Sequence, residues 1–258
     1  MSELEIIGLF AVALAAGAIN AVAGGGTTLT FPALLFFGIA PRVAIATSTF
    51  ALLIGIVGSL VGFRQHLPTV KPWLWRFVPA SILGALLGSW LLTHTGEKSL
   101  SKLVPFLILF AAVLILIQGI SKRFAGFEAQ GGPPGKQHAI WGVILFQFAI
   151  AMYGGYFGAG IGILMLAHLG FTGLRDIHQI NTLKTVLAFV INLAASGWFI
   201  GAGLIDWPRA AVMTVGAVAG YFLGSHYSQR IPQRRVRQLI AILGFAIAAV
   251  TFYKEFLG

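Results

Sequence analysis

Two clusters of glycine, at residues 24–26 and 158–162, each stand directly before a short apolar run. A helix that begins at such a break exposes backbone N–H groups without an intrahelical partner, and its dipole adds positive potential at the same end. Both features favour the binding of an anion at the start of the helix. The alternative is that the glycines only allow helices to pack closely. We interpret the clusters as part of a substrate site, with these candidate residues: Gly24, Gly25, Gly26, Gly158 and Gly160.

Lys184 is a cation inside the apolar run 177–200. A charge at membrane depth costs about 2.5–3.5 kcal/mol on insertion scales unless it reaches the interface or faces a polar cavity. Asn181, Lys184 and Thr185 share one helix face, because residues three and four apart are neighbours on a helix. This grouping favours a positively charged substrate site over a lysine that only extends to the membrane surface.

Further polar candidates lie close to the predicted helix breaks. Asn20 precedes the first cluster and Thr27 and Thr28 follow it, so these three are candidate substrate ligands. Ser48 lies in the next apolar run, where its hydroxyl either bonds the backbone of its own helix or faces the site. His168, inside the second short run, is the candidate proton carrier, and a hydrogen-bonded structural histidine is the alternative reading.

The chemistry that the sequence lacks narrows the function classes. No carboxylate lies in the middle of an apolar run, so the acidic relays and sodium sites of cation-coupled pumps are not expected. There is no P-loop, no His-Glu-x-x-His and no cysteine, and Ser48 has no histidine in its segment to activate it. We therefore expect no enzyme activity, no metal site and no cofactor.

The composition identifies the elements that must position these residues. The chain has 258 residues, of which 58% are hydrophobic and 9% charged, whereas soluble domains average about 25% charged residues. Ten apolar runs follow one another at about 4–23, 27–39, 43–63, 73–93, 103–120, 139–157, 161–171, 177–200, 208–226 and 237–253. The runs 27–39 and 161–171 are too short to cross a bilayer, which takes about 20 residues. We predict an all-α polytopic membrane protein with eight full transmembrane helices and two half-helices or re-entrant segments.

The order of several motifs indicates an internal duplication. A shift of 134 residues aligns Gly24 with Gly158, Thr47-Ser48 with Asn181-Thr182, and Trp73 with Trp207. We predict a first repeat over residues 1–120, a cytoplasmic linker over 121–138 and a second repeat over 139–258. Each repeat holds five segments, an odd number, so the two repeats should be inverted across the bilayer.

The distribution of basic residues predicts the orientation. The loops on one side hold eleven: Arg64, Lys71, Arg76, Lys122, Arg123, Lys136, Arg175, Arg230, Arg234, Arg235 and Arg237. The other side holds five: Arg42, Lys98, Lys102, Arg209 and Lys254. The side richer in Lys and Arg is the cytoplasm, so in the inner membrane both termini should lie outside it. This bias also explains the net charge of +10 without a nucleic-acid partner.

Glycines at a spacing of four residues occur in two other runs, at Gly84 and Gly88 and at Gly216, Gly220 and Gly224. Small residues at this spacing favour close helix packing. We interpret these glycines as packing residues, and such faces could also join two copies into a homodimer.

Several motifs resemble a known family. The first half reads Asn20-Ala-Val-Ala-Gly-Gly-Gly-Thr-Thr-Leu-Thr-Phe-Pro32, and the second reads Gly155-Tyr-Phe-Gly-Ala-Gly-Ile-Gly162 followed by Asn181-Thr-Leu-Lys184. Together they resemble the sulfite exporter TauE/SafE family of permeases, also called the toluene-sulfonate uptake permease family. Lys71-Pro72-Trp73 departs from the Val-Asp-Trp-like turn that the family often has. The resemblance implies transport of sulfite, organosulfonates or related small sulfur anions without ATP, in either direction.

The residues and the resemblance agree on one expectation. They predict a secondary transporter embedded in the lipid bilayer. This transporter would hold a small anionic substrate between the half-helix N-termini of the two repeats. Two alternatives remain from the sequence: a passive anion channel, and a membrane scaffold subunit that transports nothing.

Overall fold

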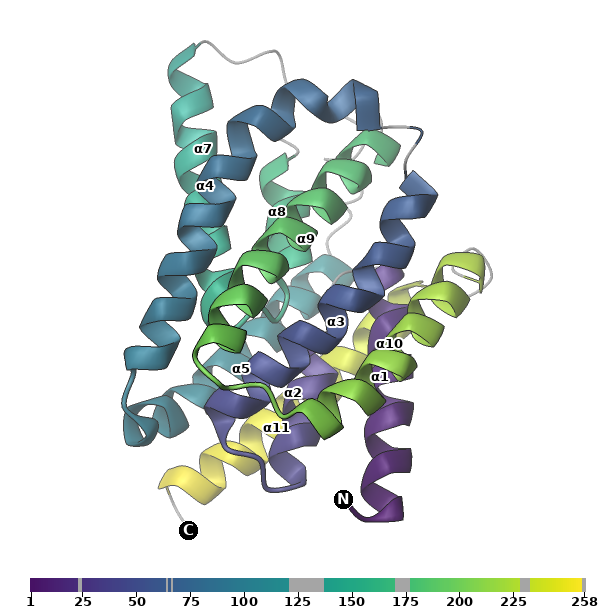
Figure 1. Cartoon of the computed structure of the whole chain (residues 1–258), viewed down its shortest axis with the longest axis vertical. Coiled ribbons are helices and arrows are strands. Elements are labelled where there is room, and N and C mark those ends of the chain that lie inside the picture. Colours follow the sequence, from purple (N-terminus) through teal and green to yellow (C-terminus); the bar gives the residue numbers. More distant parts are fainter. Residues whose placement is uncertain are drawn as a thin grey trace.

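The computed structural model describes residues 1–22, 25–63, 65, 67–120, 137–169, 177–227 and 233–256. These residues form ten α-helices and no strand. The helices are α1 (Glu3–Val22), α2 (Thr27–Phe36), α3 (Pro41–Phe63), α4 (Leu67–His94), α5 (Glu97–Ile120), α7 (Gln137–Tyr156), α8 (Ile161–Leu169), α9 (Ile177–Gly201), α10 (Trp207–Tyr227) and α11 (Gln233–Phe256) (Figure 1). The predicted all-α architecture is confirmed. Most of the predicted linker, up to residue 136, lies outside the described residues.

Two of the helices are short, as the sequence predicts. α2 has 10 residues and α8 has 9, so at 1.5 Å per residue they rise only about 14–15 Å, half of a hydrocarbon core of about 30 Å. Figure 1 shows α2 in the lower half of the molecule and α8 in the upper half. Among the described residues, five helices contain a span long and apolar enough to cross a membrane: α1, α3, α4, α5 and α9.

The long helix α4 begins earlier than its apolar run, at Leu67 rather than at residue 73. Pro72 and Pro79 lie inside it, and its upper part turns away from the rest of the helix in Figure 1. A proline inside a helix removes one backbone hydrogen bond and bends the helix. Hydropathy finds only the apolar part of such a helix, which explains the difference in the boundary.

The closest helix pairs join the two halves of the chain. α1 packs along α10 and α4 packs along α7, while α3 lies between α9 and α10. Glycine makes these approaches possible: a Cβ on Gly220 would lie 2.0 Å from the Leu14 carbonyl oxygen, and one on Gly88 would lie 2.0 Å from that of Met152. Three further glycines face backbone in the same way: Gly84, Gly216 and Gly224. The prediction that these glycines serve packing is confirmed, within one chain; a homodimer stays a prediction.

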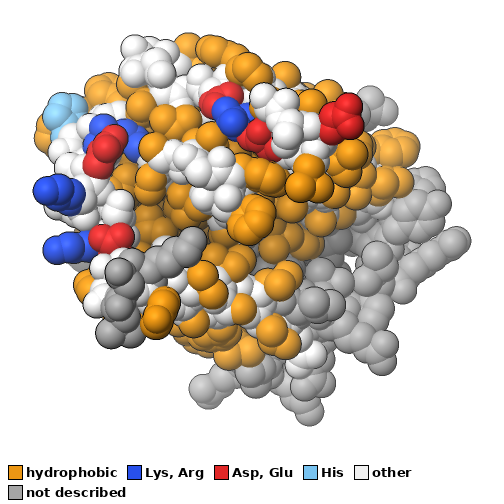
Figure 2. Space-filling model, turned by 90° about the horizontal axis from the view of Figure 1, so that it is seen from below, with side chains coloured by type: hydrophobic (Ala, Val, Ile, Leu, Met, Phe, Trp, Pro, Cys, Tyr) orange, Lys and Arg blue, Asp and Glu red, His pale blue; other side chains and the backbone are white. Residues whose placement is uncertain are grey.

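Both termini lie at the lower end of the molecule in Figure 1. Figure 2 looks onto this end, where acidic and basic side chains lie among hydrophobic ones. At this end Arg209 forms ion pairs with Glu5, at 2.7 Å, and with Asp206. The Asp206 N–H donates to the Thr47 hydroxyl at 3.1 Å. These contacts tie α10 to α1 and α3 at the end of the bundle, away from the helix breaks.

Candidate functional site

The first helix break is held by the side chain of Asn20. Its Oδ1 accepts hydrogen bonds from the N–H groups of Gly25, at 2.6 Å, and Gly26, at 2.9 Å. Gly25 has φ +147, a backbone conformation that side chains disfavour. The Thr28 hydroxyl donates to the Gly25 carbonyl at 2.5 Å. Contrary to the expectation for a bare helix start, the Gly25 and Gly26 N–H groups are therefore occupied from within the chain.

The second helix break has a different construction. Gly158 and Gly160 have φ values of +78 and +80, in the left-handed region where glycine is favoured. The Tyr153 hydroxyl donates to the Ala159 carbonyl at 2.7 Å. Here the backbone conformation and a tyrosine from α7 fix the turn.

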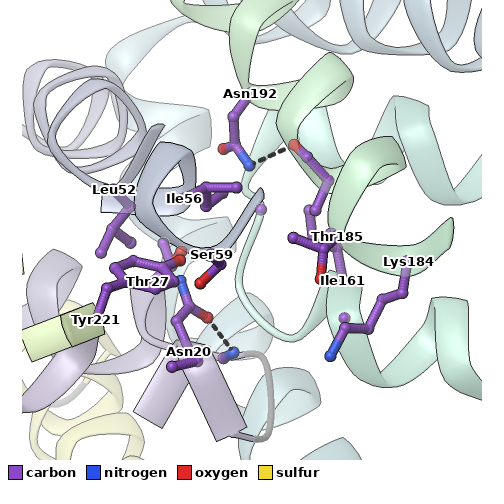
Figure 3. A pocket seen from close by; sticks show the side chains of 15 residues that line it. Asn20, Thr27, Leu52, Ile56, Ser59, Ile161, Lys184, Thr185, Asn192 and Tyr221 are labelled. Atoms are coloured by element: carbon purple, nitrogen blue, oxygen red, sulfur yellow. Dashed lines mark hydrogen bonds between the residues drawn. The ribbon is translucent and has the colours of Figure 1, made fainter. Parts of the chain in front are cut away.

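The two breaks meet at one cavity (Figure 3). Gly25 and Thr27 come from the first break, and Gly158 and Gly162 from the second. The cavity has a volume of about 50 Å³, enough for roughly three to five water molecules at about 10–15 Å³ each. Residues far apart in the sequence thus form one small cavity between two helix N-termini, with polar and aliphatic side chains in its wall.

Lys184 is the charged member of this cavity among the described residues. It lies on α9 with only 6% of its surface exposed, and it lines the cavity together with Thr185. Figure 3 shows both entering from the side opposite to Asn20 and Tyr221. No acidic side chain of the described residues joins the lining. The described wall combines this lysine and several hydroxyl and amide groups with aliphatic side chains such as those of Leu52 and Ile56.

The structure brings six of the predicted site residues together in the cavity wall: Asn20, Gly25, Thr27, Gly158, Lys184 and Thr185. Five others do not line it: Gly26, Thr28, Ser48, Gly160 and Asn181. Gly24 lies outside the described residues. Ser48 is fully buried, and its hydroxyl forms a hydrogen bond of 2.5 Å with the hydroxyl of Thr30 instead.

His168 is also absent from the cavity wall. It is 1% exposed and packs edge-on against Phe77 and Phe146, with ring centroids 5.5 and 5.4 Å apart. Its Nε2 has no hydrogen-bond partner among the described residues. The structure therefore places this histidine in an aromatic cluster rather than beside the candidate ligands.

Three polar residues of the cavity wall were not among the predicted site residues: Ser59, Asn192 and Tyr221. Asn192 lies seven residues after Thr185, two turns along the same helix face, so helical spacing could have found it. Tyr221 comes from the other end of the chain, and its hydroxyl is a hydrogen-bond partner of the Asn20 side chain. Nothing in the spacing of the sequence points to that contact.

A substitution at Ser48 tests whether this residue lies outside the cavity wall, as the structure places it. We expect Ser48→Ala to lower the free energy of unfolding by about 1 kcal/mol, because Thr30 loses its buried partner, and to leave anion binding unchanged. Thr185→Val, which removes a hydroxyl from the wall, should weaken anion binding instead. Unfolding curves and binding isotherms of both variants check this, and weaker binding in Ser48→Ala would contradict the assignment.

Comparisons with known proteins identify the family of the chain. A family model described as "Sulfite exporter TauE/SafE" matches residues 9–251. A "Probable membrane transporter protein" of Haemophilus influenzae is 28% identical over 251 residues, which cover 96% of this chain and 94% of the relative. The "Probable membrane transporter protein YfcA" of Escherichia coli K12 is 25% identical, with coverage of 98% and 91%. No solved structure matches the chain. The chain belongs to the TauE/SafE family of membrane transporters.

Proposed function

We propose that this chain is a secondary transporter of small sulfur-containing anions, such as sulfite or organosulfonates, that works without ATP. The observation that carries the proposal is the cavity at which the two helix breaks meet, with Lys184 in its wall. In transporters built from repeats, interrupted helices in matching positions of the two halves mark the substrate site. The family name supplies the class of anion.

The cavity suits a small oxyanion in charge and in size. Lys184 supplies positive charge, and Thr27, Ser59, Thr185 and Tyr221 supply hydroxyl groups that can donate to oxygen atoms. A volume of about 50 Å³ favours an ion of a few heavy atoms, or the charged head group of a larger sulfonate. Desolvation of such an ion is offset only where donors are already in place, and this wall provides them.

We further propose that the two halves form inverted repeats with eight full spans and two re-entrant half-helices. The matching contacts support this arrangement, because α1 against α10 and α7 against α4 are equivalent pairs once the halves are superposed in sequence. α3 with α10 and α9 with α4 form a second such pair. The short helices α2 and α8 also occupy the second place in each half.

The proposed location is the inner membrane, with both termini outside the cytoplasm. The basis is the excess of Lys and Arg in the loops away from the termini. Because the chain has no cysteine, single substitutions Ser2→Cys and Gly131→Cys report each side alone. We expect an impermeant thiol reagent added to intact spheroplasts to label Ser2→Cys and to spare Gly131→Cys. The reverse pattern would contradict the orientation.

Flux into proteoliposomes tests transport itself. We expect purified protein to give sulfite uptake that saturates with concentration and that is accelerated by sulfite on the opposite side. Uptake that rises linearly without such counterflow would favour a passive channel. Flux equal to that of protein-free liposomes, from protein shown to be folded, would favour the scaffold alternative.

A further inference from the structure

We propose that the first turns of α4, residues 67–76, bind the head group of an anionic phospholipid at the membrane surface. Lys71 and Arg76 contact the phosphate of this lipid, and Trp75 lies among the head groups. None of these three residues lines the cavity of Lys184. The lipid site is therefore separate from the proposed substrate site and does not depend on transport.

α4 is longer than a membrane span requires. Its 28 residues rise about 42 Å at 1.5 Å each, whereas a hydrocarbon core of about 30 Å takes about 20 residues. The charged residues indicate where the extra length lies, because Lys71 and Arg76 are in the first turns and residues 77–94 contain no Asp, Glu, Lys or Arg. Pro72 and Pro79 lie inside α4, and its upper part turns away from the rest of the helix (Figure 1). We therefore place residues 67–76 at the membrane surface and residues 77–94 across the membrane.

One face of these first turns is apolar and buried. Val70 and Phe77 belong to a hydrophobic core cluster, and Trp73 and Leu74 pack against it. The four positions recur at intervals of three and four residues, as one helix face requires. This face fixes the first turns of α4 against the bundle, so the opposite face has a defined direction.

The opposite face presents two cations and a tryptophan. Lys71, Trp75 and Arg76 are exposed, and Trp75 has 75% of its surface exposed. Tryptophan is enriched at the level of the lipid head groups, where both its apolar ring and its polar N–H are accommodated. Lysine and arginine at this level keep their charged ends in the head-group region while their aliphatic stems lie against apolar surface. The exposed face therefore combines the side chains that suit a phospholipid head group.

The matching helix start in the second repeat differs in its charges. The shift of 134 residues aligns Trp73 with Trp207, the first residue of α10. Arg209, in the first turn of α10, forms ion pairs with Glu5 and with Asp206. At this helix start the charge of the arginine is thus compensated within the chain.

The cations in the first turns of α4 are not compensated in this way. No ion pair among the described residues includes Lys71 or Arg76. The Arg76 guanidinium lies over the ring of Trp73, 5.4 Å from its centroid, and this contact orients the arginine without using its N–H donors. A guanidinium with free donors can bind a phosphate with two hydrogen bonds. The charge favours an anionic partner, and the position at the membrane surface makes a phospholipid that partner.

The test measures how much phosphatidylglycerol raises the unfolding temperature of the purified protein in a neutral detergent, because a ligand that binds only the folded protein stabilises it. We expect phosphatidylglycerol to stabilise the parent protein more than phosphatidylcholine with the same acyl chains. Lys71→Gln combined with Arg76→Gln should bind phosphatidylglycerol at least about fivefold more weakly, the factor that corresponds to one basic residue near an anionic membrane. An affinity like that of the parent protein in this double variant would overturn the proposal.

A second double variant is the matched control. Lys98→Gln combined with Lys102→Gln also removes two exposed charges, from the start of α5, which follows the opposite end of α4. We expect it to bind phosphatidylglycerol as the parent protein does. Equal weakening in both double variants would mean that net charge alone attracts the lipid, and it would overturn a site on α4.

Two further measurements identify the ligand. Trp75→Ala should weaken the binding of phosphatidylglycerol although every charge remains, and unchanged binding would overturn the role of the tryptophan. Inorganic phosphate should not stabilise the parent protein through this surface. Stabilisation by phosphate that disappears in the Lys71 and Arg76 double variant would overturn the lipid assignment in favour of a soluble anion. Without lipid, all these variants should unfold close to the parent temperature, because the replaced side chains are exposed.

Discussion

Replacing Lys184 with methionine is expected to weaken sulfite binding by at least about tenfold, or about 1.5 kcal/mol, the lower end for a hydrogen bond to a charged group. Methionine keeps most of the side-chain length and removes the charge. The lysine is 6% exposed and lies in the cavity wall, so its charge acts where solvent screens it little. Binding isotherms on purified protein measure the effect.

Two further lysine variants make this result specific. Lys184→Arg should retain part of the affinity, because the charge remains while the geometry of the donors changes. Lys102→Met, on the exposed surface of α5, is the matched control and should bind as the parent protein does. Unchanged affinity in Lys184→Met would mean that the lysine is not a substrate ligand.

The second large effect is expected at Gly160, where we predict that Gly160→Ala lowers the rate of transport by about tenfold or more. Gly160 has φ +80, and a left-handed conformation costs an L-residue about 1–2 kcal/mol. The nearest atom to a new Cβ, Leu114 Cδ1, would lie 3.5 Å away, which is an ordinary contact. The effect should therefore come from a changed turn ahead of α8 rather than from crowding, and flux per folded molecule measures it.

Substitutions at two other glycines distinguish an effect on turn geometry from an effect on helix packing. Gly88→Ala would place a Cβ 2.0 Å from the Met152 carbonyl oxygen, so it should push α4 from α7 and lower thermal stability. Gly142→Ala on α7 meets no atom within 4 Å and should behave as the parent protein does. If Gly160→Ala and Gly88→Ala lose stability and flux in the same proportion, the glycines of the break are packing residues and the site loses a main support.

The sequence predicted the helix breaks well because they depend on local properties. Glycines at residues 25, 158 and 160 have positive φ, and the apolar runs that follow are too short to span. Both properties can be read from residue type and length alone. Lys184 was equally visible, since a charge inside an apolar run is rare and needs a reason.

The rest of the cavity wall depends on which helices meet. Tyr221 and Ser59 reach the site because α10 and α3 lie against each other and against the first break, and no spacing within one helix reveals that. The same limit explains the residues that do not line the wall. Thr28 and Ser48 have the right type and neighbourhood, but their hydroxyls bond Gly25 and Thr30 instead, as short hydroxyl side chains often do with nearby groups.

The central claim is that an anion binds where the two helix breaks meet. Selenite, the pyramidal selenium analogue of sulfite, can locate it by anomalous diffraction, and the chain has no cysteine that would react with it. We predict one anomalous peak in the cavity between Lys184 and Asn20, present in crystals of the parent protein and lost in Lys184→Met at the same selenite concentration. A peak only outside this cavity, or an unchanged peak in Lys184→Met, would contradict the account.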